Sequence, residues 1–510
     1  MEHIFKVVND FFEFIVPISD FLWDFPTNIE FYSKIPILGK FSFALILLIG
    51  TGIFFSIKTK FVQVTKFKTG LRILIKKKTS DIGVSPLASF LLSSATRVGP
   101  GNIMGVTGAI SVGGPGAVFW MWISAFFGMA TAFAESVLAQ VFKEQDEDNY
   151  IGGLPFYGKK ILGNKRAAGI LLSVCFIMYA LFTLPGQTFH LFTALGSVAE
   201  VIGGVKYERT SSVYYIIAAV IFFSVLFTTI GGIRRVTKVT DILVPVMAVI
   251  YMLIVLFIIC INLKMIPYFF TEVIRGAFSP RAIFGGAFGV ALAQGIKRGL
   301  MSNEAGQGTI TMAAAVADND HPCEQGFVQS IGVFLDTIVV CTLTGFVVVM
   351  AHLWSNGASG VEWEAIKSSK LDVYLSSIQY LIPGQSFDAV IKCTVSLCYG
   401  LFAFTTLIGL ILFTEISGSF ISTNKYFIFF LRLLGAVLFV PFGELTVLSG
   451  LELGNLWYIS DFINIMIVYA NVPVILLGTG IVTKTLDHYI RTNGKKFISK
   501  EIGIDTEVWK

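Results

Sequence analysis

Charged residues are scarce in this chain of 510 residues. Only 14% are Asp, Glu, Lys or Arg, against about 25% in an ordinary soluble domain. Hydrophobic residues make up 55%, and the mean hydropathy is +0.76. So few charges cannot cover a water-soluble body of this size, so the composition predicts an integral membrane protein. The net charge of +5 is too small to indicate a nucleic-acid partner.

Several signals of other protein classes are also lacking. The six cysteines form no CxxC pair and no metal-ligand spacing, so we expect neither a disulfide framework nor a zinc site. The first residues, MEHIFKVVNDFFEF, have no basic region and no small-residue cleavage site, which argues against a cleaved signal peptide. No nucleophile–base pair, metal cluster or nucleotide-binding loop is apparent. We therefore do not expect an enzyme.

Long apolar runs are what the chain does contain. A helix needs about 20 apolar residues to cross the hydrocarbon core of a bilayer. Eleven candidate spans satisfy this length, and the seventh is the weakest because Gly, Lys and Arg interrupt it. They lie near residues 38–57, 86–111, 115–141, 168–195, 212–231, 241–263, 281–301, 326–352, 388–414, 427–446 and 456–482.

Basic residues predict the orientation of these spans. The loop after the first span holds eight bases between Lys58 and Lys78 and almost no acids, which is typical of a cytoplasmic loop. With eleven crossings the N-terminus is then outside and the C-terminus cytoplasmic. Three further basic clusters fall on the same predicted side: residues 159–166, 234–238 and 484–500.

Two spans contain residues that interrupt a helix. In the second span, two glycines flank Pro100 within Ser94–Asn102. In the seventh, glycines recur in Phe284–Gly289 and again in Gln294–Gly299. Irregular backbone is tolerated at membrane depth only where it lines a site. Glycines that merely allow close helix packing are the alternative explanation.

The spacing of the two interruptions predicts the domain organisation. Five spans separate them, and the two interrupted spans run in opposite directions, which is typical of secondary transporters with a binding site at the breaks. The expected fold is an all-α integral membrane protein in which one extra N-terminal helix precedes a 5+5 inverted repeat. The expected segments are 1–80 with the first span and basic loop, 81–265 with spans 2–6, 266–485 with spans 7–11, and a cytoplasmic tail over 486–510.

The chemistry of such breaks favours a zwitterionic solute. The N-terminus of a half-helix presents N–H groups and a positive dipole end to an anion. Unwound carbonyls can bind a cation. An α-amino acid matches both features, and a single protomer suffices to bind it.

Four motifs resemble the alanine/glycine:cation symporter family, also called sodium:alanine symporters. Val98–Asn102 (VGPGN) is similar to the family's VGTGN stretch, and residues 113–128 (GGPGAVFWMWISAFFG) look like its signature. Residues 295–308 (GIKRGLMSNEAGQG) and 321–345 resemble two further family motifs. The resemblance extends over residues 40–485 and implies eleven spans with the inverted-repeat fold of the leucine-transporter type. It also implies sodium-coupled uptake of a small neutral amino acid across a bacterial-type inner membrane.

The same resemblance implies a set of substrate residues. They are Gly99, Pro100, Gly101, Asn102, Gln187, Phe284, Gly285, Gly286, Phe288 and Leu410. The sequence departs from the family pattern at three positions: Pro100 replaces a Thr, Phe189 replaces an Asn, and Leu410 replaces a Trp that closes the pocket. All three concern the substrate, so we expect a neutral amino acid larger or more apolar than alanine.

Sodium, the expected coupling ion, requires oxygen ligands. The hydroxyls of Thr405 and Thr406, with the carbonyls of Ala95 and Val98, would supply them, as similarity to sodium symporters of the leucine-transporter type implies. Asn102 could add an oxygen to a second site. Each threonine could instead bond the carbonyl four residues earlier in its helix. A proton-coupled or uncoupled amino-acid transporter of the same fold is the alternative function.

Six charged residues lie in or near the spans. Glu135, Asp336 and Arg97 are expected to be paired, to form a cytoplasmic gate or to relay protons, because an unpaired charge is costly there. Lys297 and Arg298, together with Glu304, are predicted near the inner end of the seventh span, where they would form ion pairs or a gate at the cytoplasmic mouth.

Overall fold

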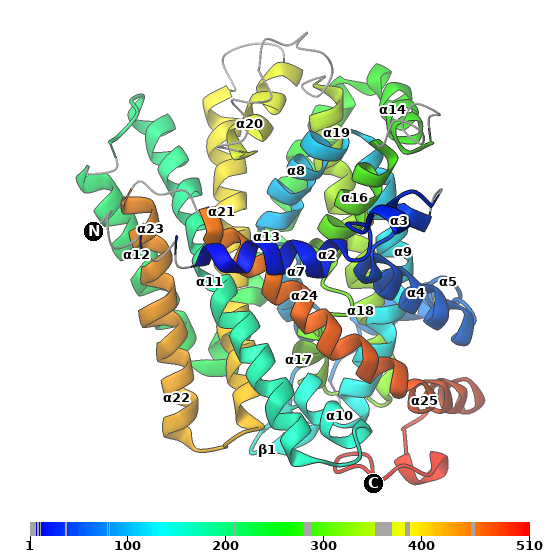
Figure 1. Cartoon of the computed structure of the whole chain (residues 1–510). Helices are drawn as coiled ribbons and strands as arrows, with labels where there is room; N and C mark the ends of the chain where they lie inside the picture. The colour runs from blue at the N-terminus through cyan, green and yellow to red at the C-terminus, as the bar shows by residue number, and fades with distance from the viewer. Residues whose placement is uncertain are drawn as a thin grey trace.

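The computed structural model describes residues 7, 10, 12–35, 38–78, 80, 82–208, 211–278, 287–351, 370–382, 388–449 and 454–510. In these ranges the regular structure is helical except for one antiparallel hairpin, in which Glu144 pairs with Ile151, and an isolated bridge between Val84 and Ala317. Figure 1 shows the helices gathered into one bundle. The predicted all-α class is therefore confirmed.

The elements of the first half are, in chain order, η1 Phe12–Phe14, α2 Ile15–Asp24, α3 Glu30–Ser33, η2 Leu38–Lys40, α4 Phe43–Lys58, α5 Val62–Thr65, α6 Phe67–Leu74, α7 Pro86–Arg97, η3 Pro100–Asn102, α8 Met104–Gly113, α9 Gly116–Val141, β1 Glu144–Asp146, β2 Asn149–Ile151, α10 Leu154–Ile161, α11 Arg166–Gly203, α12 Ser212–Ile230 and α13 Gly232–Ile261.

The elements of the second half are η4 Leu263–Met265, α14 Ile266–Phe278, α16 Ala287–Asn303, α17 Thr309–Ala315, α18 Pro322–Val333, the π-helix η5 Phe334–Cys341, α19 Thr342–Met350, α20 Lys370–Leu381, α21 Asp388–Ser419, α22 Lys425–Leu433, the π-helix η8 Leu434–Phe439, α23 Val440–Leu448, α24 Gly454–Leu477, α25 Thr479–Thr492 and η9 Ser499–Ile502.

Eight helical stretches in the described residues are long and apolar enough to cross a membrane, which confirms a multi-pass membrane protein. They are Gly116–Val141, Arg166–Gly203, Ser212–Ile230, Gly232–Ile261, Pro322–Met350, Ala389–Ser419, Lys425–Leu448 and Tyr458–Leu477. Each overlaps one predicted span. The other three predicted spans correspond to the 16-residue helix α4 and to two interrupted helices, α7–α8 and α16–α17.

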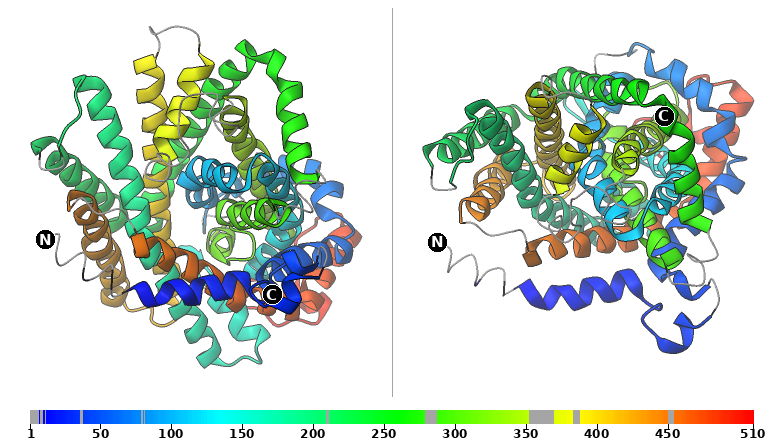
Figure 2. Two further views of the ribbon diagram at one scale, coloured as in Figure 1. Left: turned by 45° about the horizontal axis from the view of Figure 1, so that its top comes forward. Right: turned by 90° about the horizontal axis from the view of Figure 1, so that it is seen from above.

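Helices five spans apart in the predicted numbering pack against each other. Helix α9 lies along α18, where Phe133 stacks on Phe327 with ring centroids 5.4 Å apart. Helix α11 lies along α21, and the Ser173 hydroxyl donates to the Ser417 carbonyl over 2.6 Å. The interrupted helices also meet, since α8 packs on α16 and α7 on α17. Figure 2 shows α8 and α16 together inside a ring formed by the other helices.

One end of the bundle collects the loops that carry the basic clusters. The Gly83 N–H donates to the Asp148 carbonyl over 3.1 Å, and Arg234 pairs with Asp148 over 2.7 Å. Lys425 lies 3.3 Å from Glu147, and the Trp509 indole donates to the Gln140 carbonyl over 2.6 Å. We call this end, where β1, α10 and the C-terminus lie in Figure 1, the tail end. Helices α14 and α20 lie at the opposite end.

Both terminal segments are folded onto the bundle. Helix α2 crosses the bundle on the outside of α24 (Figure 1), where the Trp23 indole donates to the Asp461 carbonyl over 3.0 Å. The C-terminal segment carries Phe497 and Trp509, which are both buried. The sequence predicted only a tail over 486–510. Two aromatic side chains that pack on the bundle explain why it is ordered.

Candidate functional site

The second predicted span is broken where the sequence predicted. Helix α7 begins at Pro86 after the N-cap Ser85, whose hydroxyl accepts the Ala88 N–H, and it ends at Arg97. Val98 leaves the helical conformation with a ψ of 79°, Gly99 is extended, a single 3₁₀ turn follows, and α8 starts at Met104. A Cβ on Gly99 would lie 3.0 Å from the Thr406 hydroxyl, so the close approach of α21 favours glycine.

Asn102 stabilises this first break through hydrogen bonds of its side chain. Its side-chain oxygen accepts the Gly99 N–H over 2.9 Å, and its amide nitrogen donates to Asp336 Oδ1 over 2.6 Å. The Asn102 N–H itself donates to the Gly99 carbonyl. Among the N–H groups that the sequence assigned to a solute, that of Gly101 is left without a partner in the described residues.

The second break that the structure describes lies further along the chain than the predicted stretch Gln294–Gly299. Gln294–Gly299 belongs to the continuous helix α16, so a break there is wrong. Gly295 and Gly299 instead allow close packing: an added Cβ would lie 2.4 Å from the Ala117 carbonyl and 3.1 Å from Ser124. Phe284, Gly285 and Gly286 lie outside the described residues, and Phe288 falls in α16.

The break occurs at residues 304–308, between α16 and α17. Glu304, Gly306 and Gly308 have φ of 58°, 89° and 78°. The buried Glu135 carboxylate on α9 accepts the N–H groups of Gly306 and Gly308 over 3.1 and 3.2 Å, and Asn471 donates to it over 3.0 Å. Glu135 thereby satisfies donors that the interruption of the helix exposes.

Because the seventh span continues through this break to Ala315, Lys297 and Arg298 lie in its first half. Their predicted position at the inner end is wrong. Ion pairing is observed: Lys297 Nζ lies 2.6 Å from Asp461 Oδ2 and 4.7 Å from the centre of the Trp23 ring.

A cavity of about 360 Å³ lies beside the first break. Five predicted substrate residues line it: Gly99, Pro100, Gly101, Gln187 and Leu410. Asn102 and Phe189 are not among the lining residues. Gln187 Oε1 is buried and has no hydrogen-bond partner in the described part of the chain.

The remaining wall of the cavity is mixed. Phe182, Leu438, Phe439 and Phe442 form an apolar side, while Tyr179, His190, Glu304, Ser460 and Asn464 contribute polar groups. Sequence reasoning missed most of this set. The Glu304 carboxylate accepts hydroxyls from Thr96 and Thr309 over 3.0 and 2.9 Å. It therefore joins both interrupted helices at the cavity wall.

The proposed sodium ligands are partly brought together. The Thr406 hydroxyl donates to the Ala95 carbonyl over 3.2 Å and to Phe402 within its own helix over 2.8 Å. The Thr405 hydroxyl faces Met247 on α13, with an oxygen–sulfur distance of 3.8 Å. Val98 is buried directly after α7. No group of three His, Cys, Asp or Glu side chains forms a metal cluster among the described residues.

A buried polar cluster lies behind the first break. Asp336, in the π-helix η5, accepts hydrogen bonds from Asn102, and from Ser302 and Thr337 over 2.7 Å each. Arg97 is also fully buried and donates to the Asn303 carbonyl and to Gln329. Glu135, Asp336 and Arg97 are therefore all hydrogen-bonded inside the bundle, whereas a role in gating or proton relay stays a prediction.

Two interrupted helices beside a shared cavity, inside a bundle of apolar helices, define a membrane transporter. The sequence model of the sodium:alanine symporter family matches residues 31–502 of the chain. The chain belongs to that family, as its motifs indicated.

Several curated proteins are similar over most of their length. Amino-acid carrier protein AlsT of Bacillus subtilis (strain 168) is 33% identical over 486 residues, covering 95% of this chain and 93% of that protein. Sodium/alanine symporter AgcS of Methanococcus maripaludis is 33% identical, covering 92% and 99%. Probable sodium/glutamine symporter GlnT of B. subtilis is 34% identical, covering 88% and 87%.

The fold is similar to that of a solved transporter. The crystal structure of MhsT in complex with L-phenylalanine superposes with a TM-score of 0.56 at 14% identity. The superposition covers 81% of this chain and 90% of MhsT.

Proposed function

We propose that the chain is a sodium-coupled symporter that takes up a neutral amino acid by alternating access. The observation that carries this proposal is a pair of groups at the cavity that have no partner among the described residues. Gly101 offers an N–H for a carboxylate, and Gln187 Oε1 offers an acceptor for an ammonium group. Buried polar groups are rarely left without partners, so these two positions favour a zwitterionic solute.

The proposed substrate residues are those predicted from the sequence, and they have two different roles. Gly99, Pro100, Gly101, Gln187 and Leu410 face the solute, while Asn102 acts from behind the break. Phe284, Gly285, Gly286 and Phe288 remain substrate residues by the family resemblance alone.

The apolar side of the cavity supports a solute larger than alanine. Leu410 and the three phenylalanines form an aliphatic and aromatic wall. Each methylene buried there would contribute about 0.8 kcal/mol. Because the relatives named above include an alanine and a glutamine symporter, a competition panel must contain both solutes alongside valine, leucine and methionine.

Sodium would bind between the first break and α21. The Thr406 hydroxyl and the Ala95 carbonyl already lie together. To complete the set, the Val98 carbonyl would join them, and the Thr405 hydroxyl would turn away from the Phe402 carbonyl that it now bonds over 3.1 Å. Asn102, with Asp336 and Ser302, offers oxygen atoms for a second ion.

The proposed topology is eleven spans in an inner membrane, with the N-terminus outside and the C-terminus cytoplasmic. One extra helix would precede two inverted sets of five, in segments 81–265 and 266–485. Its support is that the loops after spans 1, 3, 5 and 9 and the C-terminal tail, all expected in the cytoplasm, meet at the tail end. An error of one in the span count would separate them.

Uptake into proteoliposomes tests the coupling ion. Sodium is replaced by potassium at constant pH, and Thr406→Val is compared with Thr414→Val. Both threonines are buried in α21, but Thr414 bonds only the carbonyl of its own helix. We expect sodium replacement and Thr406→Val to abolish concentrative uptake, and Thr414→Val to retain it.

Other outcomes would select the alternative. Concentrative uptake that persists without sodium and is abolished by a protonophore would indicate proton coupling. Uptake that equilibrates but never concentrates the solute would indicate an uncoupled transporter. Equal loss in both threonine variants would place the ion elsewhere.

A further inference from the structure

The loop at residues 316–321 is where the second interrupted helix ends, at the tail end of the bundle. It is bonded to the segment that precedes the first interrupted helix. The Val84 N–H donates to the Val316 carbonyl over 3.0 Å, and the Asp318 N–H donates to the Val84 carbonyl over 2.8 Å. The start of α7 and the end of α17 are thus held side by side.

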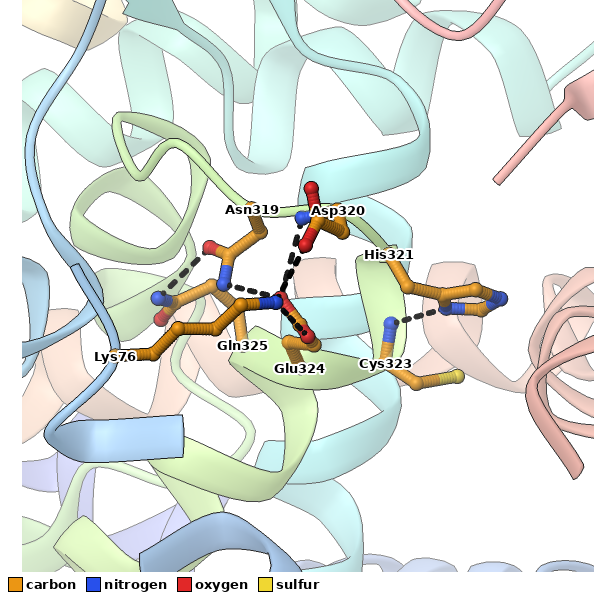
Figure 3. A network of polar contacts seen from close by, with 7 residues as sticks. All are labelled: Lys76, Asn319, Asp320, His321, Cys323, Glu324 and Gln325. Atoms are coloured by element: carbon orange, nitrogen blue, oxygen red, sulfur yellow. Dashed lines mark hydrogen bonds and ion pairs between the residues drawn. The ribbon is translucent and has the colours of Figure 1, made fainter. Parts of the chain in front are cut away.

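An ion-pair lock formed by Lys76, Asp320 and Glu324 closes over this loop (Figure 3). Lys76 Nζ lies 2.5 Å from Asp320 Oδ2 and 2.8 Å from Glu324 Oε1. Glu324 also accepts from the Asn319 side chain and the Asp320 N–H over 3.0 and 3.2 Å. Burial lowers the pKa of Lys76, but the two carboxylates outweigh it and raise the pKa above its usual value.

The C-terminal segment 494–510, which we call the strap, is bonded to the same loop. The Phe497 N–H donates to the Asp320 carbonyl over 2.9 Å. The Trp509 indole donates to Gln140 at the end of α9, and His488, in the helix α25 that precedes the strap, bonds His321 over 3.0 Å. Phe497 and Trp509 are 1% and 5% exposed, so the strap is packed rather than loosely attached.

The cavity does not extend to this end. Among the described residues that line it, none belongs to α17, to the loop 316–321 or to the strap. A solute bound beside Gly101 therefore has no open route to the tail end. Leaving there requires α7 and α17 to separate, which breaks the Val84 bonds and the ion-pair lock.

We infer that the loop 316–321 is the gate at the tail end, and that Lys76 and Trp509 are positioning residues that hold it closed. Release of the lock and displacement of the strap would be a step of the transport cycle. The inference rests on the proposed alternating access, but not on which ion drives it.

A native cysteine reports on this gate. Cys323 is fully buried in the first turn of α18, and its N–H donates to His321 Nδ1 of the loop over 3.1 Å. A polar thiol reagent is applied to membrane sheets that are open on both sides, and labelling of each cysteine is measured by peptide mass spectrometry. Cys398, which is 2% exposed in α21, reports on general unfolding.

We expect Lys76→Gln and Trp509→Ala each to raise the labelling rate of Cys323 about tenfold, the size expected when a buried polar contact loses one partner. Cys398 should not change. Lys76→Arg, which keeps the positive charge, should retain the slow labelling rate of Cys323. Arg234→Gln, which removes an exposed pair with Asp148 at the same end, is the matched control and should have no effect.

A second cysteine distinguishes opening of a gate from local loosening of the structure around Cys323. Ser460→Cys places a thiol in the cavity wall. If Lys76→Gln opens the tail end, alternating access requires labelling of this cysteine to fall as that of Cys323 rises. A rise at Cys323 with no change at Ser460→Cys would reduce Lys76 to a structural contact and overturn the inference.

The wild-type protein provides the final arm. Cys323 should be labelled faster than Cys398 during turnover with sodium and amino acid. If it is never labelled faster than Cys398 under any ionic condition, the gate is not at this loop. The mutational arm needs no ligand, so it stands even if sodium coupling fails.

Discussion

Asn102 Nδ2 lies 2.6 Å from Asp336 Oδ1, which ties the first break to the π-helix of α18–α19. Because Asn102 Oδ1 also accepts the Gly99 N–H, one side chain joins the unwound backbone to a buried carboxylate. The geometry of the substrate loop therefore depends on a residue more than two hundred positions away in the chain.

Asn102→Ala should weaken both the fold and the substrate site. The substitution removes the amide that donates to Asp336 Oδ1. An unpaired buried polar group lowers the free energy of unfolding by about 1–3 kcal/mol. We expect a lower melting temperature and a KM raised by about five- to a hundredfold in uptake assays. Asn262→Ala is the control, because Asn262 also bonds two backbone carbonyls but far from the cavity. An unchanged KM in Asn102→Ala would remove this residue from the site.

Gln187→Ala should affect binding without affecting stability. Gln187 Oε1 has no partner among the described residues, so its removal takes no hydrogen bond from that atom within the fold. We expect a raised KM and a melting temperature that is unchanged or slightly higher. A fall in melting temperature equal to that of Asn102→Ala would mean that the oxygen has a structural partner.

Leu410→Trp should shift the selectivity toward small solutes. Leu410 is 1% exposed and lines the cavity, so an indole there would fill the space proposed for a larger side chain. Wild type should favour leucine and methionine, by about fourfold for each buried methylene, and the variant should favour glycine and alanine. Leu397→Trp, on the exposed side of the same helix, controls for bulk. Preference for glycine in wild type would contradict the proposed cargo.

Acid should weaken docking of the strap. Burial, aided by the charge of His488, lowers the pKa of His321 to about 3, below the roughly 6.5 of a free imidazole. The docked form binds fewer protons, so docking is full above about pH 6.5 and weakens about tenfold per unit as pH falls toward 3. His321 faces His488, Tyr489 and Phe497, and His488 in turn bonds Glu501.

Hydrogen exchange of residues 494–510 measures this effect, after correction for the intrinsic pH dependence of exchange. The control is His321→Asn, which can still accept the Cys323 N–H but does not titrate. It should flatten the response. A response of equal slope in both proteins would assign it to another group.

Paired cysteines test the orientation. Thr423 and Thr271 are both exposed, at the tail end and in α14 at the opposite end. In intact cells an impermeant thiol reagent should label Thr271→Cys and not Thr423→Cys, and inverted vesicles should reverse the result. Labelling of Thr423→Cys from outside would invert the proposed topology.

The sequence predicted the first break because its cause is local. Pro100 has no N–H, and Gly99 and Gly101 flank it within five residues. The break at residues 304–308 was not predicted because its cause is not local: Glu135, on another helix, stabilises the left-handed turns at Gly306 and Gly308. The glycines at 295 and 299 gave the same sequence signal for a different reason, close packing on α9.

The candidate site shows the same division. Gly101, Gln187 and Leu410 could be named from motifs. Glu304, Tyr179 and Asn464 could not, because only the folded bundle brings helices so distant in sequence to one cavity. The partners of Arg97 and Asp336 lie more than two hundred residues away and carry no periodic signal.

The carboxylate of Glu135 has a consequence for where motion can occur. Its bonds to Gly306 and Gly308, and the bond from Asn471 on α24, keep the second interruption unwound without any solute. The hydrogen bonds to Glu135 and Asn471 replace the lost helical hydrogen bonds when the protein folds. Solute binding therefore does not have to unwind a helix, and the affinity for the solute is correspondingly higher. Because this turn is hydrogen-bonded to both α9 and α24, it is a rigid connection and not a hinge. Rearrangement during transport should then concentrate at the free ends of the half-helices.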